Sequence, residues 1–104
     1  MNYTTYKVTV PSNIKGKIDK DKQAEMLELV ISTLSDNFGG ATAIPAKGGY
    51  KDNSGAIILE DVFEVVAYAK EANHSLLDKL ANKIKDFMEQ ESVMYIIDNQ
   101  PYFI

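Results

Sequence analysis

The residues best able to do chemistry in this sequence include three acidic side chains, Glu60, Asp61 and Glu64, that follow one another closely in an apolar segment. Carboxylates at such a spacing can form an acid–base pair or hold a divalent cation, provided that they converge. In an extended strand, however, Glu60 and Glu64 share one face while Asp61 points to the other, so only a bulge would bring all three together. We therefore expect an acidic strand face in solvent rather than a metal or acid–base site.

A second candidate is the segment GGYKDNSG at residues 48–55. Its Asp, Asn and Gly residues tolerate the bends and the positive φ angles of a hairpin turn, so a hairpin arm is predicted here. Two interpretations stay open, because the arm either is only a flexible turn or presents side chains to a partner. The predicted partner-binding residues of the arm and the strand after it are Tyr50, Lys51, Asp52, Glu60, Asp61 and Glu64.

The glycine pair Gly39-Gly40 raises the question of a phosphate-binding loop. Such loops place their glycines between a strand and the helix that follows, so that the helix N-terminus faces the phosphate. Here the pair follows a predicted helix and precedes a strand, and no Gly-Lys-Ser/Thr ending is present. Gly39 is therefore predicted to end the helix in a left-handed conformation.

His74 is the single histidine of the chain, and cysteine is absent. Catalysis by His74 would need a nucleophile or an orienting carboxylate beside it, and the sequence places neither. A zinc site would have to rely on carboxylates for its other ligands. No catalytic residue, metal or cofactor is predicted, and His74 is expected to lie in solvent or to cap a helix.

Charge is distributed unevenly along the 104 residues, whose formal net charge is −4. Residues 1–52 carry 7 Lys and 6 acidic residues, and residues 53–104 carry 4 Lys and 9 acidic residues, which gives +1 and −5. There is no arginine to bind phosphates or guanine edges with a planar fork, so direct nucleic-acid binding is disfavoured. No apolar run reaches the ~20 residues of a membrane span. A cytoplasmic location is expected.

Periodicity predicts the elements that position these side chains. Alternating apolar residues indicate strands, and apolar residues at i, i+3 and i+4 indicate helices. Asp19 or Asp21 can cap the first helix, and Asn73 or Ser75 can cap the second. The predicted elements are a strand at 3–10, a helix at 22–38, a strand from 41 that resumes at 48–51, a strand at 56–69, a helix at 73–91 and a strand at 92–98, followed by an apolar C-terminal tail at 98–104.

This order of elements predicts one α+β domain over residues 1–104, with the ferredoxin-like split βαβ arrangement β-α-β-β-α-β. Right-handed crossovers would place both helices on one face of a four-stranded antiparallel sheet. Val62, Val66 and Tyr68 are expected on the other face, where a second copy or another protein would pack sheet to sheet.

The run FGGAT, the later GGYKDNSGAIILEDVFEV and the first strand YKVTVP resemble small proteins encoded by phages and plasmids. The shared pattern is a Phe-Gly-Gly-x-Thr segment, a Gly-Gly-aromatic hairpin and a hydrophobic strand that contains glutamate. It covers roughly residues 6–68. The resemblance implies a mobile-element protein, but no activity and no functional residues.

Acidic character, small size and the lack of a catalytic set favour a non-enzymatic protein-interaction module. One version is an accessory protein that inhibits a host defence protein through its acidic face. The alternative is a small-molecule-binding or enzymatic ferredoxin-like dimer, with a pocket lined by Tyr50, Phe63 or His74. A nucleic-acid-binding sheet face is the least favoured class, because acidic residues flank its aromatic side chains.

Overall fold

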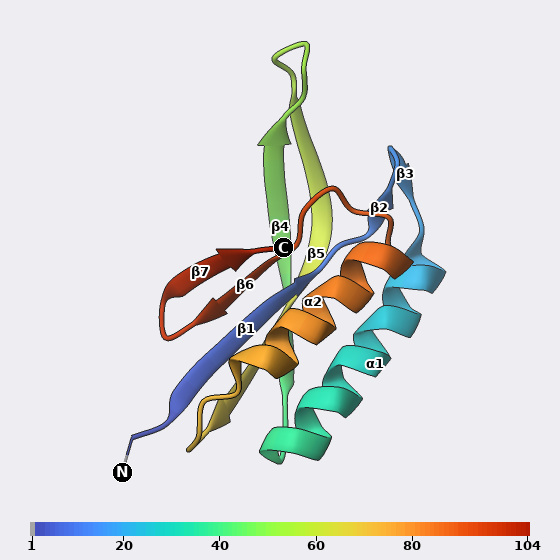
Figure 1. Cartoon of the computed structure of the whole chain (residues 1–104). Helices are drawn as coiled ribbons and strands as arrows, with labels where there is room; N and C mark the ends of the chain where they lie inside the picture. The colour runs from blue at the N-terminus through green and yellow to red at the C-terminus, as the bar shows by residue number, and fades with distance from the viewer. Residues whose placement is uncertain (1) are drawn as a thin grey trace.

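Two long helices cover one face of a twisted sheet in the computed structural model, which describes residues 2–104 (Figure 1). The helices are α1 (Lys20–Phe38) and α2 (His74–Phe87). Among the described residues, no helix combines the length and the apolar character needed to cross a bilayer. The strands are β1 (Thr4–Val10), β2 (Asn13–Ile14), β3 (Lys17–Ile18), β4 (Thr42–Lys51), β5 (Ile57–Ala69), β6 (Met94–Ile97) and β7 (Gln100–Phe103).

The main sheet has five strands in the order β4-β5-β1-β6-β7, and every neighbouring pair is antiparallel. Because β5 lies between β1 and β4, the unit β1–α1–β4 is a split βαβ unit. β2 and β3 form a separate two-stranded hairpin. The predicted α+β class with two helices and an antiparallel sheet is confirmed, whereas the prediction of four strands is wrong.

The fifth strand comes from residues 98–104, which were predicted to be an apolar tail. Asp98 and Asn99 both take positive φ angles, 48° and 68°, and form a two-residue turn that returns the chain along β6 as β7. Asn and Asp are among the residues that tolerate this conformation. Ile104 then exchanges backbone hydrogen bonds with Val93, so the chain end is tied to the sheet.

The core lies between the sheet and the helices. Alternation in β1 turns Tyr6, Val8 and Val10 toward the helices, and all three are almost completely buried. The helical periodicity of α1 and α2 supplies the opposing apolar stripes. The core residues from the two helices are Met26, Val30, Leu34, Leu77, Leu80, Ala81 and Ile84.

Both helices begin at residues that the sequence identified as caps. Asp19 accepts a hydrogen bond from Lys22 N at 2.9 Å, and Asn73 accepts one from Leu76 N at 3.2 Å. Gly39 ends α1 with a φ of 90°, as predicted. α2 ends at Phe87, earlier than the predicted 91, because the chain leaves the helix and Glu89 takes a φ of 49°. The residues after Met88 therefore form a loop instead of a last helical turn.

β4 and β5 form a long arm that projects beyond the ends of both helices (Figure 1) and lengthens the molecule to 47 Å. Their register is continuous from Thr42 opposite Val66 to Lys51 opposite Ile57, so the bulge considered near Glu60 is absent. The predicted turn closes the arm: the Asp52 carboxylate accepts hydrogen bonds from Ser54 N at 2.9 Å and Ala56 N at 3.0 Å.

The sheet face opposite the helices carries the residues expected there. Val65 and Ala67 pair with the inward-facing β1 residues, so the alternate residues Val66 and Tyr68 point away from the helices. Tyr68 is 58% exposed and Ile44, on the same face of β4, is 48% exposed. Packing of a second copy on this face stays a prediction.

Candidate functional site

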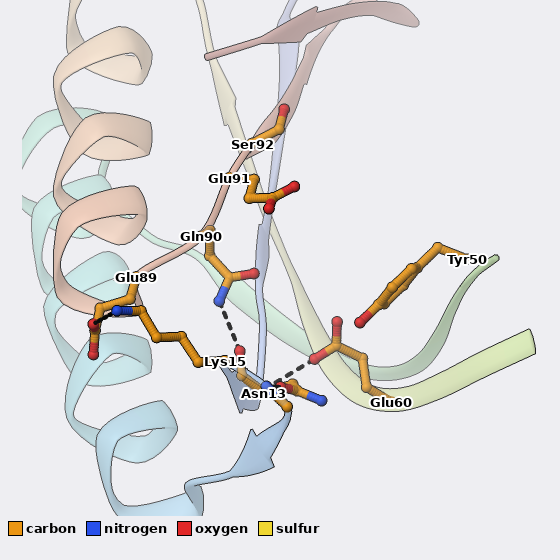
Figure 2. Close-up of a pocket in the computed structure, with 9 residues that line it drawn as sticks. Asn13, Lys15, Tyr50, Glu60, Glu89, Gln90, Glu91 and Ser92 are labelled. Atoms are coloured by element: carbon orange, nitrogen blue, oxygen red, sulfur yellow. Dashed lines mark hydrogen bonds and ion pairs between the residues drawn. The ribbon is translucent and has the colours of Figure 1, made fainter. Parts of the chain in front are cut away.

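A cavity of about 580 Å³ lies where the β4–β5 arm, the β2–β3 hairpin and the loop after α2 meet (Figure 2). The arm contributes Tyr50 and Glu60, the hairpin contributes Asn13 and Lys15, and the loop contributes residues 89–92. A second hollow of about 300 Å³ shares Tyr50 and Glu60 and continues past Thr9 and Met94. The two hollows therefore run together around one tyrosine and one glutamate.

Glu60 is held in place by backbone donors at the start of the β2–β3 region. Its Oε2 atom accepts hydrogen bonds from Ser12 N at 3.2 Å and from Asn13 N at 3.0 Å. Two backbone N–H groups that donate to one carboxylate oxygen fix the orientation of the side chain. Because both bonds go to one oxygen, the other oxygen is left facing the cavity (Figure 2). Glu60 is thus a fixed negative charge at the cavity wall.

Tyr50 lies beside this carboxylate on the same face of the arm, because Glu60 pairs with Gly48, two residues before Tyr50. It precedes the arm's turn on β4, and its side chain is 51% exposed. Figure 2 shows its hydroxyl directed toward the Glu60 carboxylate, with the ring extending away from it along the arm. An aromatic face beside a carboxylate can bind a cation through both groups, or stack on a planar ring.

The β2–β3 hairpin closes a third side of the cavity with a tight two-residue turn at Lys15 and Gly16. Both take positive φ angles, 48° and 83°, which is the conformation of a type I′ hairpin turn. The Asn13 side chain supports the turn by accepting a hydrogen bond from Gly16 N at 2.8 Å. Lys15 reaches across to the loop after α2, where its Nζ lies 3.1 Å from Glu89 Oε1.

The loop after α2 is attached to the β2–β3 hairpin by Gln90. The Gln90 Nε2 atom donates to Asn13 O and to Met88 O, both at 2.7 Å. These bonds occupy the amide nitrogen and leave the side-chain oxygen directed toward the cavity (Figure 2). The loop therefore presents an amide oxygen, the Glu89 and Glu91 carboxylates and the Ser92 hydroxyl along one wall.

The charges of this site are unbalanced. Three carboxylates line the cavity, from Glu60, Glu89 and Glu91, and Lys15 is the one cationic side chain among the described residues that line it. Surfaces of one dominant sign attract ligands of the opposite sign. The arrangement suits a small ligand with more positive than negative centres.

The structure brings together only two of the six residues predicted to bind a partner. Tyr50 and Glu60 share the cavity, whereas Lys51 and Asp52 lie beyond it at the end of the arm. Asp52 is engaged in its own turn, where a hydrogen bond from the Ser54 side chain lowers the pKa of the Asp52 carboxyl.

Asp61 and Glu64 have other partners. Asp61 faces the helix side, where a hydrogen bond from Lys47 at 2.7 Å, with Lys20 at 3.4 Å, holds the pKa of the Asp61 carboxyl below its usual range. Glu64 shares the open face with Glu60, as expected, but accepts a hydrogen bond from Thr9 Oγ1 at 2.7 Å. The acidic cluster of the sequence is therefore divided between two faces of β5.

His74 and Phe63, which the alternative hypothesis placed in a pocket, lie outside this cavity. His74 begins α2 and contacts two tyrosine rings edge-on, Tyr95 at 5.6 Å and Tyr102 at 4.4 Å between ring centroids. Tyr95 is buried and donates a hydrogen bond to Asp78. No group of three or more His, Asp or Glu side chains able to hold a metal ion occurs within residues 2–104.

Sequence reasoning missed the residues that complete the cavity, namely Asn13, Lys15 and residues 89–92. Residues 11–17 were assigned to no predicted element, and residues 89–91 were included in the second predicted helix. The Lys15-Gly16 pair between Asn13 and Lys17 was the available signal, because glycine after a polar residue favours a tight hairpin turn. No signal in the sequence placed these two segments beside Tyr50.

No protein-family model and no curated protein matches the chain. Among solved structures, it is similar to a phage SAM lyase in complex with S-methyl-5′-thioadenosine, with a TM-score of 0.72 and 16% identity over 98% of this chain and 88% of that chain. A phage SAM lyase in the apo state gives 0.69 and 16% over 97% and 87%. The periplasmic divalent cation tolerance protein CutA from Archaeoglobus fulgidus gives 0.54 and 9% over 99% and 82%.

These likenesses correct the functional prediction made from the sequence. A non-enzymatic interaction module, with its version as an inhibitor of a host protein, is contradicted by the similarity of the fold to that of a phage SAM lyase over nearly the whole chain. The alternative of a small-molecule-binding or enzymatic fold agrees better with this finding. The likeness is also consistent with a phage protein, while no family model supports the Phe-Gly-Gly-x-Thr pattern.

Proposed function

We propose that this protein is a lyase that cleaves S-adenosylmethionine, or a closely related adenosyl sulfonium compound, and releases methylthioadenosine. The observation that carries the proposal is the cavity in which Tyr50 faces Glu60, in a chain folded like a phage SAM lyase. The strand order, with β5 between β1 and β4, further supports a ferredoxin-like fold to which β7 adds an edge strand.

The size and charge of the cavity support a substrate of this class. Its volume of about 580 Å³ lies within the range of roughly 300–1,000 Å³ typical of small-molecule sites. S-adenosylmethionine carries two positive centres, the sulfonium and the α-ammonium, and one carboxylate. Three carboxylates and one lysine line the cavity, so its excess of negative charge complements the net positive charge of the substrate.

The proposed reaction breaks the bond between sulfur and Cγ of the amino-acid side chain. The electron pair of that bond goes to sulfur, which becomes the neutral thioether of methylthioadenosine. The carboxylate oxygen of the leaving fragment forms a bond to Cγ and closes a lactone, so no water, proton or cofactor is consumed. The protein then has to bind, orient and shield the substrate from water.

Tyr50 and Glu60 have distinct roles in this scheme. The Glu60 carboxylate, fixed by Ser12 N and Asn13 N, binds one cationic centre of the substrate and sets its position. The Tyr50 ring lies beside the sulfonium, where a cation–π contact contributes about 0.5–2 kcal/mol, and its hydroxyl stays directed toward Glu60. Both residues act on the substrate directly.

The proposal is tested by incubating the purified protein with S-adenosylmethionine and following methylthioadenosine by liquid chromatography and mass spectrometry. We expect methylthioadenosine to accumulate faster than in buffer alone, together with homoserine lactone. Glu60→Gln removes the fixed charge and should lower the rate by about 100-fold.

Glu64→Gln is the matched control, because Glu64 lies on the same face of β5 and accepts a hydrogen bond from Thr9 but itself lines neither hollow. It should keep at least about half of the wild-type rate. Failure of the wild-type protein to release methylthioadenosine above the background rate would contradict the proposed activity.

A further inference from the structure

Resting on the proposed function, we infer that Lys15 recognises the α-carboxylate of the substrate and exchanges its ion pair with Glu89 for that carboxylate. Lys15 would then be the residue that distinguishes ligands with a free carboxylate from ligands without one. The inference stands on the charge distribution of the cavity, the geometry of the β2–β3 turn and the exposure of the Lys15–Glu89 pair.

The cavity lining has more acidic than basic side chains. A bound S-adenosylmethionine brings one negative group into a cavity that already holds three carboxylates. A carboxylate placed among carboxylates is unfavourable unless a cation or several donors meet it. Lys15 is the one cationic side chain among the described residues that line the cavity, so the substrate carboxylate has one charged partner within reach.

Both residues of the Lys15–Glu89 ion pair have an unusual backbone conformation. Lys15 has a φ of 48° and Glu89 has a φ of 49°, a conformation that residues other than Gly, Asn and Asp seldom adopt. The neighbouring Gly16 adopts its positive φ without strain. The two turns thus carry an ion pair at the edge of the cavity, on the side away from Tyr50 (Figure 2). Such strained positions are frequent at sites of function.

The Lys15–Glu89 ion pair is exposed, so Lys15 can exchange Glu89 for another carboxylate at little cost. The side chains of Lys15 and Glu89 are 75% and 43% exposed, and exposed ion pairs contribute little to the stability of a protein. Releasing Glu89 therefore costs little, while a carboxylate inside the partly enclosed cavity gains a partner that it otherwise lacks. The four-carbon stem of lysine allows the ammonium group to move between the two carboxylates while the turn stays fixed.

The test compares two uncleavable ligands that differ only at the carboxylate. Sinefungin carries an amine-bearing carbon in place of the sulfonium and keeps the α-carboxylate, and its methyl ester masks that carboxylate. Isothermal titration with wild-type protein should show sinefungin binding about fivefold more tightly than the ester. Lys15→Asn should remove this difference by weakening sinefungin alone, because asparagine keeps the positive-φ turn and lacks the charge.

Two further variants control for folding and for overall charge. Lys17→Asn removes the same charge from the same hairpin at an exposed residue that does not line the cavity, and should leave the fivefold difference intact. Lys15→Arg keeps the positive charge and should therefore keep the fivefold preference for sinefungin over its ester. Equal weakening of both ligands by Lys15→Asn, or no weakening of either, would overturn the inference. If wild-type protein binds neither sinefungin, its ester nor methylthioadenosine, the proposed function itself is wrong and the inference fails with it.

Discussion

The molecule contains two tyrosine–carboxylate pairs that differ in almost every other respect. Tyr95 donates a hydrogen bond to Asp78 between β6 and α2, and it is 1% exposed. Tyr102 stacks on it at 5.3 Å between ring centroids, and His74 covers its edge. Tyr50, by contrast, lies beside Glu60 at an open cavity and is 51% exposed. A tyrosine and a carboxylate thus form a sealed contact between Tyr95 and Asp78 and an open one between Tyr50 and Glu60.

The difference shows why residue type alone does not identify a site. Burial, followed by the hydrogen bond to Asp78, raises the pKa of the Tyr95 hydroxyl well above its usual value. That hydroxyl is committed to a partner inside the fold, so the pair stabilises structure. One oxygen of Glu60 accepts hydrogen bonds from two backbone N–H groups, and the other oxygen faces the cavity. A polar group that is fixed by the protein and still has a free acceptor atom can bind a ligand.

The largest expected effect on stability separates the two pairs. Tyr95→Phe removes the hydroxyl and leaves a half-buried carboxylate of Asp78 without that donor, which should lower the free energy of unfolding by about 1–3 kcal/mol. Urea denaturation followed by circular dichroism measures the change. Tyr102→Phe keeps the stacked ring and should cost less than about 0.5 kcal/mol. Equal effects of the two changes would contradict the sealed-pair interpretation.

Alkaline pH should weaken the sealed pair. The pKa of Tyr95 is raised in the folded state, so the folded chain keeps a proton that the unfolded chain releases above about pH 10. This contribution to stability is therefore complete below about pH 10 and is lost as the pH rises above it, by up to about 1.4 kcal/mol per pH unit. Denaturation between about pH 9 and about pH 11 should show a steeper loss in wild type than in Tyr95→Phe. Identical slopes would refute the assignment.

The open pair should respond in binding rather than in stability. Tyr50→Leu removes an aromatic ring that is half exposed, so the free energy of unfolding should change by less than about 0.5 kcal/mol. Loss of the cation–π contact should weaken sinefungin by about two- to fivefold in isothermal titration. An unchanged affinity would remove Tyr50 from the site.

The smallest effect is expected at Asp61, the neighbour of Glu60 that points to the other face. Its ion pairs with Lys47 and Lys20 are exposed, so Asp61→Asn should leave both the stability and methylthioadenosine release nearly unchanged. A rate that falls with Asp61→Asn as far as with Glu60→Gln would mean that charge anywhere on β5, and not the cavity, governs the reaction.

The elements of the fold could be predicted because each depends on a local pattern. Alternation in β1 and β5 indicated which residues face the helices, and Asp19, Gly39 and Asn73 marked helix ends by their turn and capping chemistry. β7 was missed because residues 98–104 do not alternate and their pairing is set by a turn at Asp98 and Asn99. The end of α2 was missed because Glu89 and Glu91 continue the pattern of a solvated helix.

The site could be predicted only in part, for a different physical reason. Tyr50 and Glu60 were chosen because exposed aromatic and acidic residues on an arm suit binding. Their cavity also needs Lys15 and Gln90, which lie far from Tyr50 and Glu60 in the sequence. The β2–β3 hairpin and the loop after α2 are joined by isolated contacts, such as the hydrogen bond from Gln90 Nε2 to Asn13 O. Periodicity reports which face a side chain takes, and not how far the chain folds over that face.

The central claim is that the open pair, and not the sealed one, supports cleavage of an adenosyl sulfonium. The most direct measurement is the initial rate of methylthioadenosine release from S-adenosylmethionine by wild type, Glu60→Gln and Tyr95→Phe, at a temperature where all three are folded by circular dichroism. We predict release by wild type, a rate about 100-fold lower for Glu60→Gln and a nearly unchanged rate for Tyr95→Phe. Equal rates for wild type and Glu60→Gln, or no release by wild type, would contradict the claim.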